Sequence, residues 1–163
     1  MERTLIIGYG NPDREDDGVA WHVLADLASR LGREVPEPYE TGFEPQGEQV
    51  DLLFQLQLMP ELAETIAAYD QVCFVDAHTG AVPHEVHFTE LQPQFQSSPF
   101  THHMTPETCL SLAQALYLKT PQGVLVSVRG YQFGFSRRLS PRSAALAEQA
   151  VELIWEWLGQ TAV

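Results

Sequence analysis

The chain has 163 residues, of which 44% are hydrophobic and 19% are charged. This length and composition predict one folded domain spanning residues 1–163 and exclude a wholly disordered chain. The formal net charge of −13 argues against nucleic acid or an anionic membrane surface as the main partner. No apolar run approaches the ~20 residues that cross a bilayer, and the N-terminus lacks a signal-peptide pattern. We therefore expect a cytoplasmic protein.

The two cysteines, Cys73 and Cys109, are far apart in the sequence and have no metal-ligand spacing. Each falls inside an apolar segment, the first in a predicted strand and the second in a predicted helix. We expect both to be buried structural thiols rather than nucleophiles.

The first elements follow one another closely. The apolar run Thr4–Ile7 predicts a buried strand that stops at a turn beginning with Gly8. From Asp17 onward the apolar residues recur with helical spacing, and Gly32 is a plausible end for that helix. Residues 33–49 contain three prolines and two glycines, which predict a loop.

Strands and helices continue to alternate along the rest of the chain. Further strands are predicted at residues 50–58, 71–76, 84–91 and 123–128, and helices at residues 60–69, 105–117 and from 140 onward. Thr105 is the expected N-cap of its helix, with Pro106 in the first position. Residues 84–91 alternate between apolar and polar, as in an edge strand. This order predicts a single-domain α/β fold with a mostly parallel twisted sheet and helices on both faces.

The loop after the first strand carries four carboxylates in five positions: Asp13, Glu15, Asp16 and Asp17. One of them would suffice to cap the following helix. Four adjacent carboxylates repel one another, and a cation would relieve that repulsion. A dinucleotide site is excluded, because Asp13 stands where G-x-G-x-x-G has its third glycine and the carboxylates would repel a pyrophosphate.

Two other loops carry candidate ligands. Asp76 ends an apolar strand, where it would face the carboxyl edge of the sheet or merely start a turn. His78 follows it, either as a second ligand or, as we expect, as a solvated loop residue. His102 and His103 precede the next helix, and at most one of them is expected to face a site containing Asp17 and Asp76.

These carboxylates and one imidazole would converge at one sheet edge, because the carboxyl ends of parallel strands meet there. Oxygen and nitrogen ligands suit zinc, nickel or another borderline divalent ion. His22 is expected to be structural, and His84 and His87 to lie on the solvent face of an edge strand. The sequence has neither a His-Glu-x-x-His motif nor a Gly-x-Ser-x-Gly elbow.

In this order the three loops resemble those of the hydrogenase maturation endopeptidases, which trim the C-terminus of the nickel–iron hydrogenase large subunit. The resemblance rests on Leu5–Asn11, Asp16–Val19, Val75–Ala77, Thr101-His102 and Leu139–Pro141. The chain departs from that pattern in the short loop after Asp76 and in residues 133–138, which replace a stretch that is often acidic. Those departures bear on substrate preference.

The resemblance implies that Asp17, Asp76 and His102 are the catalytic and metal-contacting residues, with His103 as the alternative to His102. The metal would be nickel carried by the substrate, the immature large subunit, rather than a stably bound cofactor. The chain would act as a monomer and release a C-terminal extension. A metal can lower the pKa of a bound water and a carboxylate can take its proton, but nickel can equally serve only to dock the substrate.

Two other functions agree with the same residues. A nickel-binding chaperone would hold the precursor without cutting it. A generic metal-dependent hydrolase of small amides would need its own tightly held metal.

Overall fold

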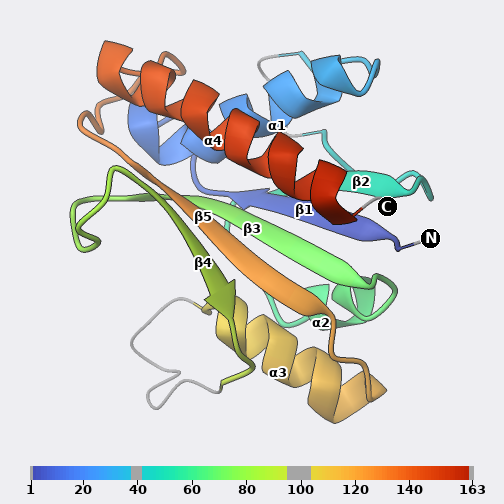
Figure 1. Cartoon of the computed structure of the whole chain (residues 1–163). Helices are drawn as coiled ribbons and strands as arrows, with labels where there is room; N and C mark the ends of the chain where they lie inside the picture. Colours follow the sequence, from blue (N-terminus) through green and yellow to red (C-terminus); the bar gives the residue numbers. More distant parts are fainter. Residues whose placement is uncertain (1, 38–41, 95–103, 162–163) are drawn as a thin grey trace.

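The computed structural model describes residues 2–37, 42–94 and 104–161 and contains one five-stranded sheet (Figure 1). Its strands are β1 (Thr4–Tyr9), β2 (Val50–Gln55), β3 (Gln71–His78), β4 (Val86–Leu91) and β5 (Gln122–Arg129). The order across the sheet is β2-β1-β3-β5-β4. Every pairing is parallel except that of β4, which lies antiparallel to β5 at one edge.

Helices cover both faces of this sheet (Figure 1). The helices α1 (Val19–Arg30) and α4 (Pro141–Thr161) lie on one face, and α2 (Leu62–Ile66) and α3 (Pro106–Tyr117) lie on the other. A short 3-10 helix, η1 (Glu15–Gly18), precedes α1. The predicted α/β fold with a mostly parallel sheet is confirmed.

The four parallel strands are mostly apolar and have both faces largely buried, as is typical of parallel sheets covered by helices. In β1, Ile6 packs into the core under α1 and α4, whereas its neighbours Leu5 and Ile7 pack into the core beside α2 and α3. The alternation continues in β3, where Cys73 faces the first core and Phe74 the second. All five residues have no exposed surface.

The predicted helix boundaries at Gly32 and Thr105 are confirmed. Gly32 has φ +73°, and its N–H and that of Arg33 donate to the carbonyls of Ser29 and Ala28, which is a Schellman end. At the start of α3, the Thr105 hydroxyl accepts the Thr108 N–H at 3.2 Å.

Three elements are shorter than predicted. The strand expected over residues 84–91 is β4, which begins at Val86. The strand from Val50 ends at Gln55, because the chain then leaves the sheet and Leu58 packs into the core beside α2. The helix expected over residues 60–69 is α2, and it ends at Ile66. The next turn tightens, since the N–H of Tyr69 donates to the carbonyl of Ile66 three residues earlier. None of the described helices is long and apolar enough to cross a membrane.

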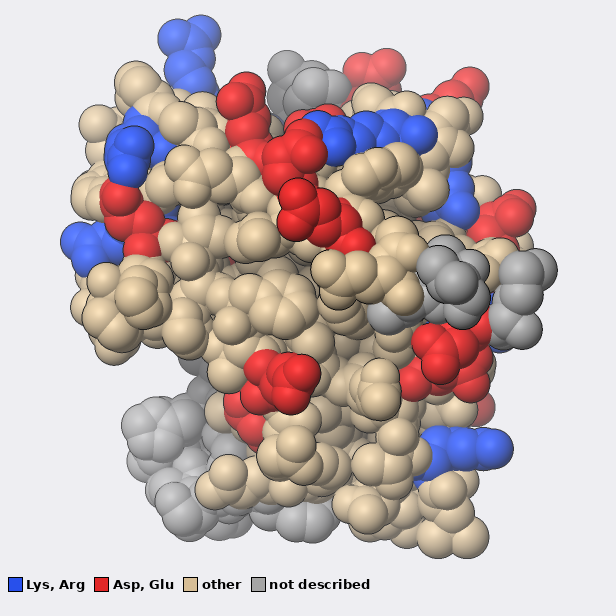
Figure 2. All heavy atoms as spheres, in the orientation of Figure 1, with Lys and Arg blue, Asp and Glu red and all other residues tan. Residues whose placement is uncertain are grey.

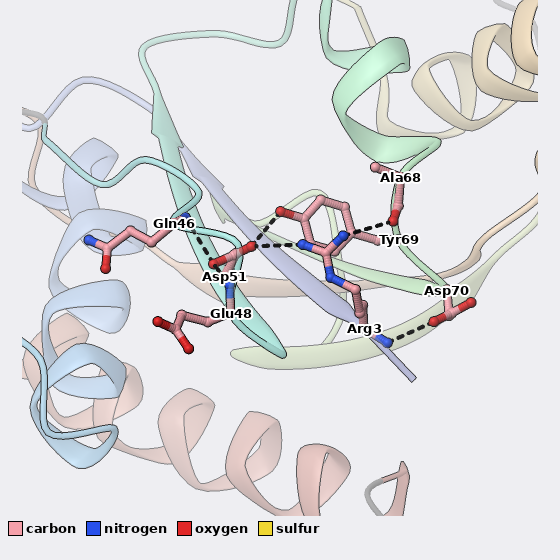
Figure 3. A network of polar contacts seen from close by, with 7 residues as sticks. All are labelled: Arg3, Gln46, Glu48, Asp51, Ala68, Tyr69 and Asp70. Atoms are coloured by element: carbon pink, nitrogen blue, oxygen red, sulfur yellow. Dashed lines mark hydrogen bonds and ion pairs between the residues drawn. The ribbon is translucent and has the colours of Figure 1, made fainter. Parts of the chain in front are cut away.

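A buried carboxylate closes the edge of the sheet where β1 and β2 begin (Figure 3). Asp51 accepts hydrogen bonds from the Tyr69 hydroxyl at 2.6 Å, from the N–H groups of Gln46 and Glu48 at 3.0 and 3.1 Å, and from Arg3 at 3.4 Å. Burial alone would raise the pKa of Asp51, but these hydrogen bonds outweigh it and hold the pKa below 3.8. This network joins two strands and the α2–β3 connection at the edge opposite to the strands' carboxyl ends.

Candidate active site

Asp76 lies at the carboxyl edge of the sheet and is held by two hydroxyl groups from the neighbouring strands. Its register partner on β5 is Ser127, whose hydroxyl donates to Oδ1 at 2.9 Å. The Tyr9 hydroxyl, from the end of β1, donates to Oδ2 at 2.8 Å. Because side chains alternate along a strand, all three point to the side of the sheet that α2 and α3 cover.

The pKa of the Asp76 carboxyl is raised above its ordinary value. Burial is the main cause, and the nearby charge of Asp17 adds to it. The hydrogen bonds from Tyr9 and Ser127 act in the opposite direction without outweighing burial. Tyr9 itself has a raised pKa, because of burial and then because of the adjacent Asp76, so it remains a protonated donor.

Asp17 is held in a tight loop that brings it toward Asp76. Its Oδ2 accepts the Asn11 N–H at 2.8 Å, which closes the loop between β1 and η1. Gly10 has φ +136°, and a Cβ there would stand 2.2 Å from the carbonyl oxygen of Asp17. The glycine is therefore required by the backbone. Two of the three predicted site residues, Asp17 and Asp76, are close enough for the charge of one to shift the pKa of the other.

Asp16 has a different environment from Asp17, since it is completely buried. Its carboxylate accepts the N–H groups of Tyr131, Gln132 and Ser140 at 2.8 to 2.9 Å and the Ser140 hydroxyl at 2.6 Å. Burial alone would raise the pKa of Asp16, but these hydrogen bonds outweigh it and the pKa is lowered. Asp16 thus anchors the loop of Asp17 to the β5–α4 connection.

The four clustered carboxylates do not share one environment. They diverge: Asp13 pairs with Arg137 at 2.7 Å, Asp16 is enclosed by N–H groups, and Asp17 turns toward Asp76. Neither η1 nor α1 has a side-chain N-cap hydrogen bond, although Glu15, Asp16 and Asp17 lie in the first turn of η1.

His78 is not the solvated residue that we expected. The strand β3 runs two residues beyond Asp76, so His78 points to the same face and is half-buried. Its Nδ1 accepts the Gly80 N–H at 3.1 Å, and its Nε2 is buried and has no hydrogen-bond partner among the residues that the structure describes. The imidazole lies close enough to Asp76 to lower the pKa of that carboxyl.

The other histidines and the cysteines are structural or peripheral. His22 Nε2 contacts the Arg137 carbonyl at 3.2 Å, and burial lowers the pKa of this histidine. His84 is exposed, as predicted, but His87, on which it stacks at 5.5 Å, is half-buried. Cys73 and Cys109 are both buried, and burial raises the pKa of Cys109 to about 12. Neither thiol therefore has the low pKa of a nucleophile.

The predicted third ligand is not tested, because His102 and His103 lie outside the described residues. Among residues 2–37, 42–94 and 104–161, no three histidine, cysteine, aspartate or glutamate side chains are grouped so that they could hold a metal ion.

Sequence reasoning missed the residues that hold the site together. Ser127 is the polar residue in an otherwise apolar run, Val124–Val128, and that exception was a usable signal. Tyr9 lies two positions after Ile7 and so shares its face, but only the strand order shows that it meets Asp76. The role of Asp16 had no local signal, since its partners lie more than 110 positions away.

A groove of about 350 Å³ opens at the end of β2, beside the loop of Asp17. Phe43, Phe54, Leu56 and Met59 supply its apolar surface. The Gly10 N–H donates to the Gln55 carbonyl at 3.3 Å, which links this groove to the loop.

The chain is acidic, with 22 carboxylates against 9 lysine and arginine side chains. On the face drawn in Figure 2, acidic groups are spread out and the basic ones lie toward the periphery. This face therefore presents no continuous basic surface for a polyanion.

Solved structures with the same fold include several hydrogenase maturation enzymes. The hydrogenase maturating endopeptidase HybD from Escherichia coli is 20% identical, with a TM-score of 0.64 over 98% of this chain and 93% of that one. The NiFe hydrogenase maturation protease HycI from Thermococcus kodakarensis KOD1 is 24% identical, with a TM-score of 0.63 over 95% and 91%. An endopeptidase from Escherichia coli is 19% identical, with a TM-score of 0.66 over 99% and 94%.

The chain therefore has the fold of the solved hydrogenase maturation endopeptidases, over nearly its whole length. No protein-family model and no curated protein matches its sequence.

Proposed function

We propose that this chain is an endopeptidase that removes the C-terminal extension of a nickel–iron hydrogenase large-subunit precursor. The observation that supports the proposal is that Asp17 follows β1 and Asp76 lies near the end of the neighbouring β3, close enough for the charge of Asp17 to raise the pKa of Asp76, in a fold shared with hydrogenase maturation endopeptidases. Fold alone does not specify function, so the proposal depends on the chemistry of these two carboxyl groups.

The environment of the two carboxyl groups suits proton transfer. A raised pKa moves the Asp76 carboxyl toward the range in which it can both take and return a proton near neutral pH. Tyr9 and Ser127 fix both oxygens of that carboxyl, so its orientation does not depend on the substrate. In the proposed reaction, a carboxylate of the pair takes the proton of the attacking water and returns it to the leaving amine.

Nickel enters the proposal as part of the substrate. Asp17, Asp76 and His102 would complete the coordination of a nickel ion already seated in the precursor, so that only a nickel-loaded precursor is cut. Oxygen and nitrogen donors suit that ion. The groove at the end of β2, which the Gly10 N–H links to the loop of Asp17, would take part of the precursor's polypeptide.

The test is the intact mass of a nickel-loaded precursor, from the organism that encodes this chain, after incubation with the protein. Loss of a C-terminal peptide with the wild type, and no loss with Asp17→Ala or Asp76→Ala, is expected. His102→Ala should also be inactive, whereas its neighbour His103→Ala serves as the matched control and should cut.

Two results would replace the proposal. An unchanged mass with detectable binding would indicate a nickel-binding chaperone of the precursor. An unchanged mass without binding, together with tightly held metal in the purified protein, would favour a metal-dependent hydrolase of small amides.

A further inference from the structure

Phe135 is the most conspicuous apolar side chain near the candidate site, because 88% of its surface is exposed. It lies in the connection between β5 and α4, the orange segment at the upper left of Figure 1. The connection contains residues 133–138, the stretch in which we expect a departure from the pattern of the hydrogenase maturation endopeptidases. Single exposed apolar side chains are ordinary on protein surfaces, so what distinguishes Phe135 is how firmly it is held beside the loop of Asp17.

The backbone around Phe135 is held firmly against the loop that carries Asp17. Ser136 forms an isolated parallel bridge with Arg14. Its N–H donates to the Asp13 carbonyl at 3.1 Å, and its own carbonyl accepts the Glu15 N–H at 2.8 Å. Phe135 is next to Ser136 in the chain, and Ser136 pairs with Arg14, which lies three residues before Asp17. The backbone of Phe135 is thus fixed beside the loop that leads into Asp17.

Arg14 supports the ring itself. Its Nη2 donates to the Phe133 carbonyl at 2.6 Å, and its Nε lies 3.1 and 3.2 Å from the carbonyls of Phe133 and Gly134. The guanidinium carbon stands 4.6 Å from the centre of the Phe135 ring, which is cation–π distance. The ring is therefore braced from one side while most of its surface stays in solvent.

An exposed aromatic group that is already ordered binds a partner at a low cost in conformational entropy. From its rigid support and its attachment to the Asp17 loop, we propose that Phe135 is an anchor that inserts into an apolar depression on the folded large-subunit precursor. This inference rests on the proposed function and specifies how the macromolecular substrate is recognised. Phe135 contacts the body of the precursor, so it affects binding rather than the chemical step.

The chain offers a matched control in Leu118, which is 87% exposed and follows α3. Because the segment after α3 leads into the start of β5, Leu118 lies toward the opposite edge of the sheet from the candidate site. Replacing either side chain by alanine removes a large, similarly exposed apolar group. A difference between the two variants therefore reports on where that group lies.

The experiment measures precursor binding and cleavage separately. Binding of the nickel-loaded precursor is titrated in the inactive Asp76→Asn background, and cleavage is followed by intact mass at several precursor concentrations. Phe135→Ala should raise both Kd and KM by at least tenfold and leave kcat unchanged, whereas Leu118→Ala should change neither. Phe135→Trp, which keeps an aromatic ring, should retain most of the affinity.

Equal affinity of wild type, Phe135→Ala and Leu118→Ala for the precursor would overturn the inference. Sedimentation of the free proteins tests whether Phe135 instead binds a second copy of this chain. A wild-type dimer that becomes a monomer in Phe135→Ala would show this and would also overturn the inference. If the wild type binds but does not cut, the proposed function fails, while weaker binding by Phe135→Ala alone would still support the anchor.

Discussion

Ser140 meets both oxygens of Asp16, a residue 124 positions earlier in the chain. Its N–H donates to Oδ1 at 2.8 Å and its hydroxyl donates to Oδ2 at 2.6 Å. This contact thus joins two segments that carry the sequence resemblance, Asp16–Val19 and Leu139–Pro141. The contact fixes the start of α4 to the loop that presents Asp17.

Asp16→Ala should destabilise the fold strongly. It leaves three N–H groups without their acceptor, one of them buried and two partly buried, and each buried group left unpaired costs about 1–3 kcal/mol. We expect the free energy of unfolding in urea at pH 7 to fall by about 3 kcal/mol or more. Asp13→Ala is the control, because that carboxylate is largely exposed and its loss should cost at most about 1 kcal/mol. Equal losses in the two variants would contradict the assignment of Asp16 as an anchor.

Asp76→Asn should separate activity from stability. An amide can still accept one hydroxyl and donate to another, so the contacts with Tyr9 and Ser127 survive. Because the raised pKa of Asp76 means that the fold disfavours its charge, the neutral amide should not lower the melting temperature at pH 7. Cleavage should fall at least about 100-fold, as expected for loss of a general base. A variant that unfolds well below the wild type would indicate a mainly structural role.

Gly10→Ala should damage the site through the backbone. The positive φ of Gly10 disfavours any other residue, and a Cβ would collide with the Asp17 carbonyl. We expect the β1–η1 loop to shift, with cleavage reduced at least tenfold. Gly32→Ala is a useful comparison, since Gly32 also has positive φ but open space around its Cβ position. That variant should lose about 1 kcal/mol of stability and keep its activity.

Tyr69→Phe should weaken the opposite edge of the sheet without affecting cleavage. The pKa of Asp51 is held below 3.8, so its ionised form stabilises the fold above that pH, and the contribution disappears as the pH falls through the lowered pKa. Removing the Tyr69 hydroxyl should cost about 1 kcal/mol at pH 7. The difference from the wild type should shrink below pH 4. A difference that grows in acid would contradict this sign.

The fold could be predicted from the sequence because its signals are local. Apolar runs such as Thr4–Ile7 and the Thr105-Pro106 pair mark where strands and helices begin. The length of α2 was overestimated, because the turn after it places Tyr69 against Asp51, and this tertiary contact leaves no local signal in the sequence.

The site was predictable only in part. Asp17 follows β1 and Asp76 lies near the end of β3, and the carboxyl ends of neighbouring parallel strands lie side by side. The hydroxyl groups that hold Asp76 depend on strand order and register, which residue spacing does not specify. We expected His78 to be solvated because the strand was predicted to end at Asp76. The strand β3 instead continues to His78.

The most direct test of the central claim compares nickel-loaded and nickel-free precursor in one time course with the wild-type protein, followed by intact mass. We predict that the nickel-loaded precursor loses a single C-terminal peptide and that the nickel-free precursor keeps its full mass. Cleavage of both forms at the same rate would contradict recognition through nickel, and cleavage of neither would contradict the peptidase itself.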